Sequence, residues 1–417
     1  MIKLLIPIFF ALLLGCEEAE QPVETPAEVQ RAIPSRVYSG AEVLVRDSIH
    51  ILSNKKIGIV GNHTSLVFGK THLVDTLISK GVNVKKVFSP EHGFRGDADA
   101  GAHIANSTDP ATGLPIVSLH GKNKKPPQNQ LAGLDLIVFD IQDVGARFYT
   151  YISTLTYVMD ACAEAGIPVL ILDRPNPNGW YVDGPVLNKK YQSFIGMHEI
   201  PAIHGMTIGE YALMILGEGW YESEKACQVD VIKAAGYKHA MRWEETGLSW
   251  VAPSPNLATL RAASLYPALC WFEPTPVSIG RGTDSAFTII GAPWLTRRKA
   301  MEGESFDLPW TTFTPRSLPG KSTYPKFQDK DCGGYRITEV PPSSRRLFML
   351  GIQLFKNAYS DYGKKPDFFK KNFERWPGNK NFKAAIIAEK SAGDIYESWK
   401  PEVEAFKQKR KNYLLYR

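Results

Sequence analysis

The feature that most constrains the fold is a regular alternation of short apolar segments and helical segments over the first two thirds of the chain. Apolar runs cover residues 56–63, 84–89, 115–119, 134–140 and 168–173, helical spacing covers 71–80, 149–166 and 207–216, and residues 228–233 alternate like a late strand. Short strands that are apolar on both faces, with helices between them, are typical of a parallel sheet covered by helices. The pattern predicts the α/β class, with a Rossmann-like, mostly parallel sheet and helices on both faces.

A change of character after about residue 260 predicts a second domain. The later segment is richer in Pro, Trp, Tyr and Lys and shows less alternation of strands and helices, and 417 residues are enough for two domains. We expect the Rossmann-like domain at residues 37–260 and a smaller C-terminal auxiliary domain of the α+β class at residues 261–417. The formal net charge of +6 is small and spread along the chain, so we predict no nucleic-acid partner.

The N-terminus has the features of an export signal. A positive start at Lys3 precedes an apolar run over residues 4–14, which ends at Gly15 and Cys16. The end of this run resembles a lipobox, so we predict a lipoprotein signal peptide at residues 1–16 with lipidation of Cys16. The alternative is a plain secretory signal. Residues 17–36 are rich in Glu, Pro, Ala and Gln and predict a flexible tether, which would place the protein in the cell envelope, lipid-anchored at the outer membrane and facing the periplasm or the surface.

Polar residues gather where three of the predicted strands end. The strand at 84–89 is followed by SPEHGFRG, the strand at 134–140 by DIQDVGARFYT, and the strand at 168–173 by DRPNPNG. Ligands of open α/β sheets bind beyond the carboxyl ends of the strands, so these segments predict an ionisable cleft. The chain lacks a G-x-G-x-x-G motif after the first strand, a P-loop and a G-x-S-x-G motif, and we predict no cofactor.

The acidic residues of these segments suit glycoside hydrolysis. Glu91 directly follows an apolar strand, where partial burial would raise the pKa of its carboxyl, as a general acid needs. Asp140 and Asp143 are the candidates for a second carboxyl, since two carboxyls that flank a glycosidic bond are the minimal equipment for this reaction. The alternatives are an ion pair of Asp140 with Arg147 or Arg174, and a capping or pairing role for Glu91. These three carboxyls would make residues 37–260 the catalytic domain.

Several other side chains predict a binding site for an acidic sugar. Arginine forks bind carboxylates in a bidentate manner, and an aromatic ring stacks on a sugar face. The histidines lack metal-ligand spacing, so we predict no metal site. The residues expected to bind substrate are His92, Arg95, Gln142, Arg147, Tyr149, Asp173, Arg174, Asn176, His204, Asn256 and Arg281.

Seven ordered strings resemble the exo-β-N-acetylmuramidases of the NamZ (YbbC-like) family. They are SPEHGFRG, FDIQDVGARFYTY, LDRPNPNG, DGPVL, HGMTIGE, SPNLATL and FEPTPVSIGRGT, and they extend from residue 89 to residue 283. The resemblance implies a Rossmann-like catalytic domain with a smaller auxiliary domain. It implies an enzyme that releases terminal N-acetylmuramic acid from the non-reducing ends of peptidoglycan fragments, with the glutamate of the E-H-G string, here Glu91, as the proposed catalytic residue.

Other functions stay open at the level of sequence. A non-catalytic glycan-binding lipoprotein would have the same cleft and would bind muropeptides without releasing a product. A metal-dependent hydrolase of an ester or phosphate would lose activity to a chelator. An esterase or amidase ranks last, because the chain has neither a serine elbow nor zinc-ligand spacing.

Overall fold

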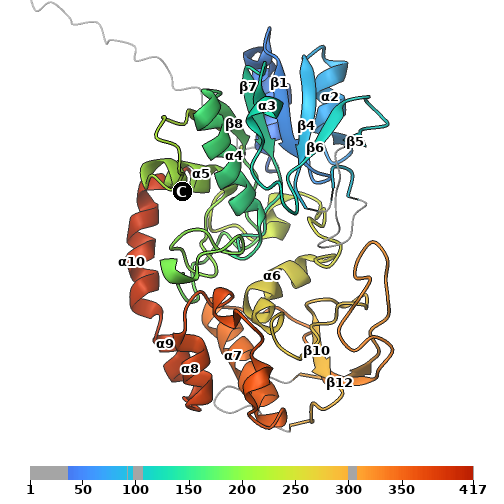
Figure 1. Cartoon of the computed structure of the whole chain (residues 1–417), viewed down its shortest axis with the longest axis vertical. Helices are drawn as coiled ribbons and strands as arrows, with labels where there is room; N and C mark the ends of the chain where they lie inside the picture. Colours follow the sequence, from blue (N-terminus) through green and yellow to red (C-terminus); the bar gives the residue numbers. More distant parts are fainter. Residues whose placement is uncertain (1–35, 92, 97–106, 299–307, 417) are drawn as a thin grey trace, which may run out of the picture. The chain divides into compact units, whose positions relative to one another are not determined.

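A seven-stranded sheet organises the first part of the chain (Figure 1). The structure is a computed structural model that describes residues 36–91, 93–96, 107–298 and 308–416, so the predicted signal peptide, Cys16 and the tether up to residue 35 lie outside the described residues. The strands are β1 (Ile57–Gly61), β4 (Val84–Ser89), β5 (Ser107–Thr108), β6 (Pro115–Ser118), β7 (Leu136–Asp140), β8 (Val169–Leu172) and β9 (Val229–Ile232).

The order of the strands is that of a Rossmann fold. The sheet runs β5-β6-β4-β1-β7-β8-β9, and every neighbouring pair is parallel except the antiparallel pair β5 and β6 at one edge. Without β5 this is the order 3-2-1-4-5-6, in which the chain moves outward from β1 first on one side and then on the other. The direction reverses between β1 and β7, so this point of the carboxyl edge is where a ligand is expected.

Both faces of the sheet are buried, which explains the apolar strands. Successive residues of β7 alternate: Val138 belongs to one hydrophobic cluster, and Phe139 belongs to the other. The first cluster includes residues of α1 (Gly40–Val43) and α2 (Leu73–Ser79), and the second includes residues of α4 (Tyr151–Ala165) and α5 (Ile208–Gly217). The central strands β1, β7 and β8 are buried along their whole length because they have no solvent-facing side, whereas β4 and β9 also carry exposed polar residues, Lys85 and Asp230.

The start of α4 differs slightly from the sequence expectation, with a consequence for function. Helical spacing predicted a helix from residue 149, whereas α4 begins at Tyr151. The two preceding residues, Tyr149 and Thr150, lie in a turn. The side chain of Tyr149 is therefore not committed to a helix face and lines a cavity described below.

The second part of the chain forms a smaller domain of mixed helices and antiparallel strands. Its sheet has the order β10-β12-β11, and both pairs are antiparallel. The elements of this domain are α6 (Leu260–Leu269), β10 (Ile289–Ala292), β11 (Trp310–Phe313), β12 (Cys332–Arg336), α7 (Ser344–Asp361), α8 (Asn381–Ile387), α9 (Ala392–Glu397) and α10 (Lys400–Arg410). The first part of the chain also contains the hairpin of β2 (Leu66–Val67) and β3 (Thr71–His72) and the short helix α3 (Gln128–Leu131). The predicted α/β fold with a smaller C-terminal α+β domain is confirmed.

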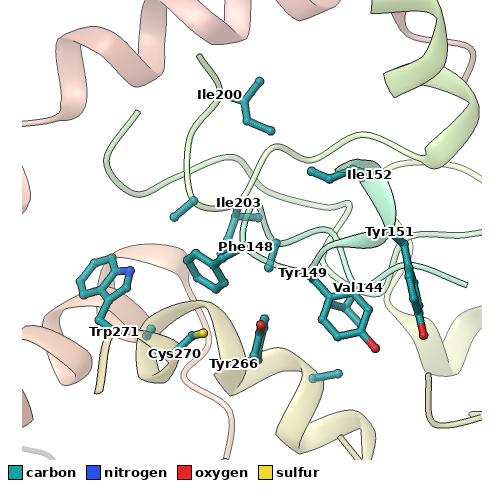
Figure 2. Close-up of a cluster of buried hydrophobic side chains, with 14 of the residues drawn as sticks. Val144, Phe148, Tyr149, Tyr151, Ile152, Ile200, Ile203, Tyr266, Cys270 and Trp271 are labelled. Carbon is teal, nitrogen blue, oxygen red and sulfur yellow. The ribbon is translucent and has the colours of Figure 1, made fainter. Parts of the chain in front are cut away.

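One continuous hydrophobic core joins the two domains. Tyr151 and Ile152 of α4 belong to the same buried cluster as Tyr266 of α6 and Trp271 (Figure 2). The second domain therefore packs against the first turn of α4 and shares its hydrophobic core. Within the described residues, no helix is both long enough and apolar enough to cross a bilayer.

The last residues of the chain return to the sheet of the first domain. The hydroxyl of Tyr416 donates a hydrogen bond to Oδ2 of Asp173 (2.6 Å) and accepts one from the backbone N–H of Ala234 (2.9 Å). Asp173 directly follows β8 and is fully buried. Burial raises the pKa of Asp173 to about 6, although donors including Thr207 and Tyr416 oppose the rise.

We expect Tyr416→Phe to destabilise the fold, because it leaves a buried carboxyl and a buried N–H each short of one partner. The loss in free energy of unfolding should be about 2 kcal/mol, as measured by urea unfolding. Tyr413→Phe is the matched control, since the Tyr413 hydroxyl bonds the more exposed Glu218 and its loss should be less than half as large. Equal losses for the two variants would contradict the anchoring role of Tyr416.

Candidate active site

Glu91 lies at the carboxyl end of the sheet, two residues beyond the end of β4. Pro90 and Gly93 form the turn that holds it, with the N–H of Gly93 donating to the carbonyl of Pro90 (3.3 Å). Gly96 in the same segment has a left-handed φ of 85°, and a Cβ there would lie 2.6 Å from the ring of His63. The glycines therefore allow this segment to pack directly against the loop that follows β1.

The half-buried Glu91 lines a cavity of about 340 Å³, which we call the Glu91 cavity. Its residues come from both domains, so the cavity lies where the strand ends meet the C-terminal domain. The lining residues are Glu91, Phe148, Tyr149, Thr150, Tyr151, Ile195, Ser254, Leu257, Tyr266, Cys270, Glu273, Arg281, Phe287 and Trp376.

Three tyrosines form an aromatic wall of this cavity (Figure 2). The ring of Tyr149 makes edge-to-face contacts with Tyr151 and Tyr266, with ring centres 5.0 Å and 5.7 Å apart. The hydroxyl of Tyr151 accepts a hydrogen bond from Asn62 (2.9 Å) and donates one to the carbonyl of Pro253 (2.8 Å). Burial, and then the nearby Glu91, raise the pKa of Tyr151, so the hydroxyl of Tyr151 stays protonated.

Two charged side chains of the Glu91 cavity, Glu273 and Arg281, come from the C-terminal domain. Arg281 donates from both Nε (2.8 Å) and Nη2 (2.7 Å) to Oε1 of Glu273. Burial would raise the pKa of Glu273, but the cations Arg281 and Lys326 outweigh this effect and hold its pKa below the usual value. Burial would likewise lower the pKa of Arg281, and the Glu273 carboxylate more than restores it. The pair is therefore charged on both sides at neutral pH.

Asp143, one predicted second carboxyl, does not line the Glu91 cavity but lies close enough to Tyr149 to influence its hydroxyl. It is almost completely buried, and its Oδ2 accepts a hydrogen bond from the N–H of Gly145 (2.7 Å). Oδ1 has no hydrogen-bond partner among the residues that the structure describes. Burial raises the pKa of Asp143 to about 7, and its charge in turn contributes to the raised pKa of Tyr149. Asp143 is absent from the lining of the Glu91 cavity, and its predicted catalytic role stays a prediction.

Asp140, the other predicted second carboxyl, makes the ion pair that the sequence offered as its alternative role. Arg174 donates to both of its oxygens, from Nε (2.6 Å) and from Nη2 (2.9 Å), and Asp140 is fully buried. The pair joins the loops that follow β7 and β8. A direct catalytic role of Asp140 stays an untested prediction, and the Glu91 cavity does not include it.

Two predicted binding residues line a different cavity, of about 290 Å³, on the same edge of the sheet. Gln142 and Arg174 contribute to its wall together with Thr64 and Trp243. The amide of Gln142 donates to the carbonyls of Asp143 and Pro175, both at 2.8 Å. Gln142 and Arg174 thus form hydrogen bonds with neighbouring loops, and neither side chain lines the Glu91 cavity.

Two of the predicted carboxylate-binding arginines have other roles. Arg95 is paired with Asp75 and Asp109, which raise its pKa and engage both sides of its guanidinium. Arg147 is fully buried, and its Nη1 and Nη2 donate to the backbone carbonyls of Pro185, Ile200 and Trp376. Neither arginine lines the Glu91 cavity, and the hydrogen bonds that they make go to the protein's own groups, so the expectation that they bind substrate stays a prediction.

Four other predicted binding residues support loops instead of lining the Glu91 cavity. Asp173 is saturated by Thr207, Gly209 and Tyr416, and the buried Asn176 donates to the carbonyl of Met206. His204 is buried, which lowers its pKa to about 3 and keeps it neutral, and its Nδ1 accepts from the N–H of Met206. Asn256 donates to the carbonyl of Lys321 and lines a third cavity. None of the four lines the Glu91 cavity, so their predicted role in substrate binding stays a prediction.

Three of the predicted site residues, Glu91, Tyr149 and Arg281, line the same cavity. His92, another predicted binding residue, lies outside the described residues. Sequence reasoning missed Glu273, Tyr266 and Trp376. Glu273 stands in the FEPTP string and carried a usable signal; Trp376 carried none, because it reaches the cavity only through the fold of the C-terminal domain. Among the described parts of the chain, no three His, Cys, Asp or Glu side chains are grouped to hold a metal ion.

Comparisons with known proteins match most of the described residues. Two family models cover consecutive segments: exo-beta-N-acetylmuramidase NamZ, N-terminal, matches residues 57–261, and its C-terminal counterpart matches residues 264–416. The peptidoglycan beta-N-acetylmuramidase NamZ of Bacillus subtilis is 36% identical over 391 residues, which cover 93% of each chain.

Solved structures agree with the fold. A DUF1343 family protein from Bacteroides fragilis is 42% identical, with a TM-score of 0.79, and the match covers 92% of this chain and 99% of that chain. A second DUF1343 family protein from the same organism is 29% identical, with a TM-score of 0.81, and covers 92% of this chain and 100% of that chain.

The raised pKa of Asp143 predicts a pH-dependent cost to stability. An aspartate of the unfolded chain titrates near pH ~4, whereas Asp143 titrates at about 7 when folded. Between these values the unfolded state releases its proton and the folded state keeps it, so the free energy of unfolding falls as the pH rises, by up to about 4 kcal/mol. Below about pH 4 this cost is absent.

Asp143→Asn removes this titration and leaves the other buried carboxyls in place. We expect the stability of the variant relative to wild type to increase steadily between about pH 4 and about pH 7, as measured by urea unfolding across that range. A stability difference that does not change with pH would contradict the buried, protonated state of Asp143.

Proposed function

The chain belongs to the exo-beta-N-acetylmuramidase NamZ family of glycosidases, and on this premise we propose that it releases terminal N-acetylmuramic acid from the non-reducing ends of peptidoglycan fragments. The relative from Bacillus subtilis is named as a peptidoglycan beta-N-acetylmuramidase, and the similarity to it covers both domains. The observation that carries the proposal is the position of Glu91 in an aromatic-walled cavity that is lined by the loops after β4 and β7 and by the C-terminal domain.

The Glu91 cavity has the features that a single acidic sugar requires. Its volume of about 340 Å³ is at the small end of ligand pockets, which favours one terminal sugar over an internal stretch of glycan. The rings of Tyr149 and Tyr266 offer apolar faces to a sugar. Arg281 is the predicted arginine that lines the cavity, so it is our candidate for contact with the lactyl carboxylate.

Glu91 supplies the proton in the reaction that we propose. Its carboxyl donates to the glycosidic oxygen while the bond between that oxygen and the anomeric carbon breaks. Water then provides a hydroxyl to the anomeric carbon, and its second proton returns to Glu91. The products are free N-acetylmuramic acid and the shortened fragment, and the reaction needs no further reactant.

The test of Glu91 is the variant Glu91→Gln, which keeps the shape of the side chain but has no acidic proton. We expect kcat for a muramic acid–glucosamine disaccharide to fall by a factor of about 10²–10⁴. A muramic glycoside with a nitrophenolate leaving group should lose much less, because that group leaves without protonation. Activity is measured as released N-acetylmuramic acid.

The control is Glu339→Gln, since Glu339 is exposed and lies outside the Glu91 cavity. Wild-type turnover of the disaccharide by folded Glu91→Gln would refute the role of Glu91. Binding of the disaccharide by wild type without any product would instead favour the glycan-binding alternative, and loss of activity to a chelator would favour a metal-dependent hydrolase.

We further propose that the protein is held in the cell envelope by a lipid on Cys16. The support is the sequence of residues 1–16 and the tether composition that follows. Wild-type protein should partition into the detergent phase of a membrane extract, and Cys16→Ser should partition into the aqueous phase. Cys162→Ser, which changes a buried free cysteine, is the control and should behave like wild type. A wild-type protein found in the aqueous phase would contradict the anchor.

A further inference from the structure

The Glu91 cavity contains a second carboxylate, and it comes from the other domain. Glu273 follows α6 and lines the cavity together with Glu91, whereas Asp140 and Asp143 do not line it. We propose that Glu273 is the second catalytic carboxylate and stabilises the positive charge that develops on the terminal sugar as its glycosidic bond breaks. This inference rests on the proposed function and assigns a residue to a role that sequence reasoning gave to Asp140 or Asp143.

The two oxygens of Glu273 have different environments. Both contacts from Arg281 converge on Oε1, at 2.8 Å and 2.7 Å. Oε2 makes no hydrogen bond to any residue that the structure describes. The exposed fraction of the Glu273 side chain is 22%, because the side chain borders the cavity. Arg281 thus fixes the orientation of the carboxylate and leaves one oxygen for a substrate.

The neighbouring cations keep this carboxylate ionised. Lys326 lies beside it, fixed by donation from Nζ to the carbonyls of Phe272, Glu273 and Val277 at 3.0, 2.8 and 2.9 Å. Together with Arg281 it holds the pKa of Glu273 below the usual value. A carboxylate of low pKa is a weak base, so it is poorly suited to take a proton from water and well suited to act as a fixed negative charge.

The other carboxyls near the site are less suited to this role. Asp140 has both oxygens bound by Arg174, and the pair is buried away from the cavity. Asp143 does not line the cavity, and burial raises its pKa to about 7. The transition state of glycoside hydrolysis carries positive charge on the anomeric carbon and the ring oxygen, and a preoriented anion in a water-poor site stabilises such charge.

The first test compares Glu273→Gln with wild type on the muramic acid–glucosamine disaccharide. We expect kcat to fall by a factor of about 10²–10³ while KM changes little, because the charge develops only in the transition state. Unlike Glu91→Gln, this variant should lose activity equally on the disaccharide and on the nitrophenyl glycoside. Glu339→Gln is again the matched control and should keep wild-type kcat.

A second comparison covers the case in which Glu273→Gln fails to fold because Arg281 has lost its partner. Arg281→Gln is compared with the double variant Glu273→Gln/Arg281→Gln, in which both charges are absent. If Glu273 is catalytic, the double variant should have a kcat at least about 10-fold lower than Arg281→Gln. Equal kcat values would overturn the proposal.

The outcomes separate this inference from the proposed function. An inactive wild-type enzyme would reject the proposed function. An active wild type with a folded Glu273→Gln variant of unchanged kcat would reject only the role of Glu273. A raised KM with unchanged kcat would show that Glu273 binds the ground state, and it would also overturn charge stabilisation.

Discussion

The parallel pairing of three central strands is the constraint on which the rest of the structure depends. Val60 of β1 pairs with Phe88 of β4 on one side and with Phe139 of β7 on the other. Because these strands run in the same direction, their carboxyl ends and the loops that follow meet at one edge. Glu91 and Tyr149 belong to two of those loops, and this pairing brings them to one cavity although more than fifty positions separate them in the chain.

Most polar residues of the motif strings stabilise the loops that carry the site. The ion pair of Asp140 with Arg174 joins two strand ends, and Arg147 donates to backbone carbonyls of three segments. Position 145 requires glycine because a Cβ there would collide with the side chain of Asn176. Buried charges require partners, and most of the polar atoms of these side chains bind groups of the protein itself. The result is a preorganised frame, in which the cavity residues are positioned before a substrate arrives.

The cavity depends on both domains. Glu91 comes from the sheet, whereas Glu273 and Arg281 come from the segment after α6, and a continuous hydrophobic core that includes Trp271 and Tyr151 fixes the two parts against each other. Electrostatic stabilisation of a transition state requires charges that do not rearrange during the reaction. The shared hydrophobic core supports this condition, and the reaction that we propose uses residues of the C-terminal domain.

The sequence by itself determined the alternation of strands and helices in the first part of the chain and the Rossmann-like class, because periodicity is a local property of the chain. It did not separate Arg281, which lines the cavity, from Arg147, which is buried, since both have the same chemistry and follow similar glycine-containing strings. Only the tertiary structure decided which polar side chains face the cavity and which hold loops. That outcome depends on contacts between segments distant in sequence, such as the hydrogen bond from Arg147 to the carbonyl of Trp376. No local pattern of the sequence encodes such contacts.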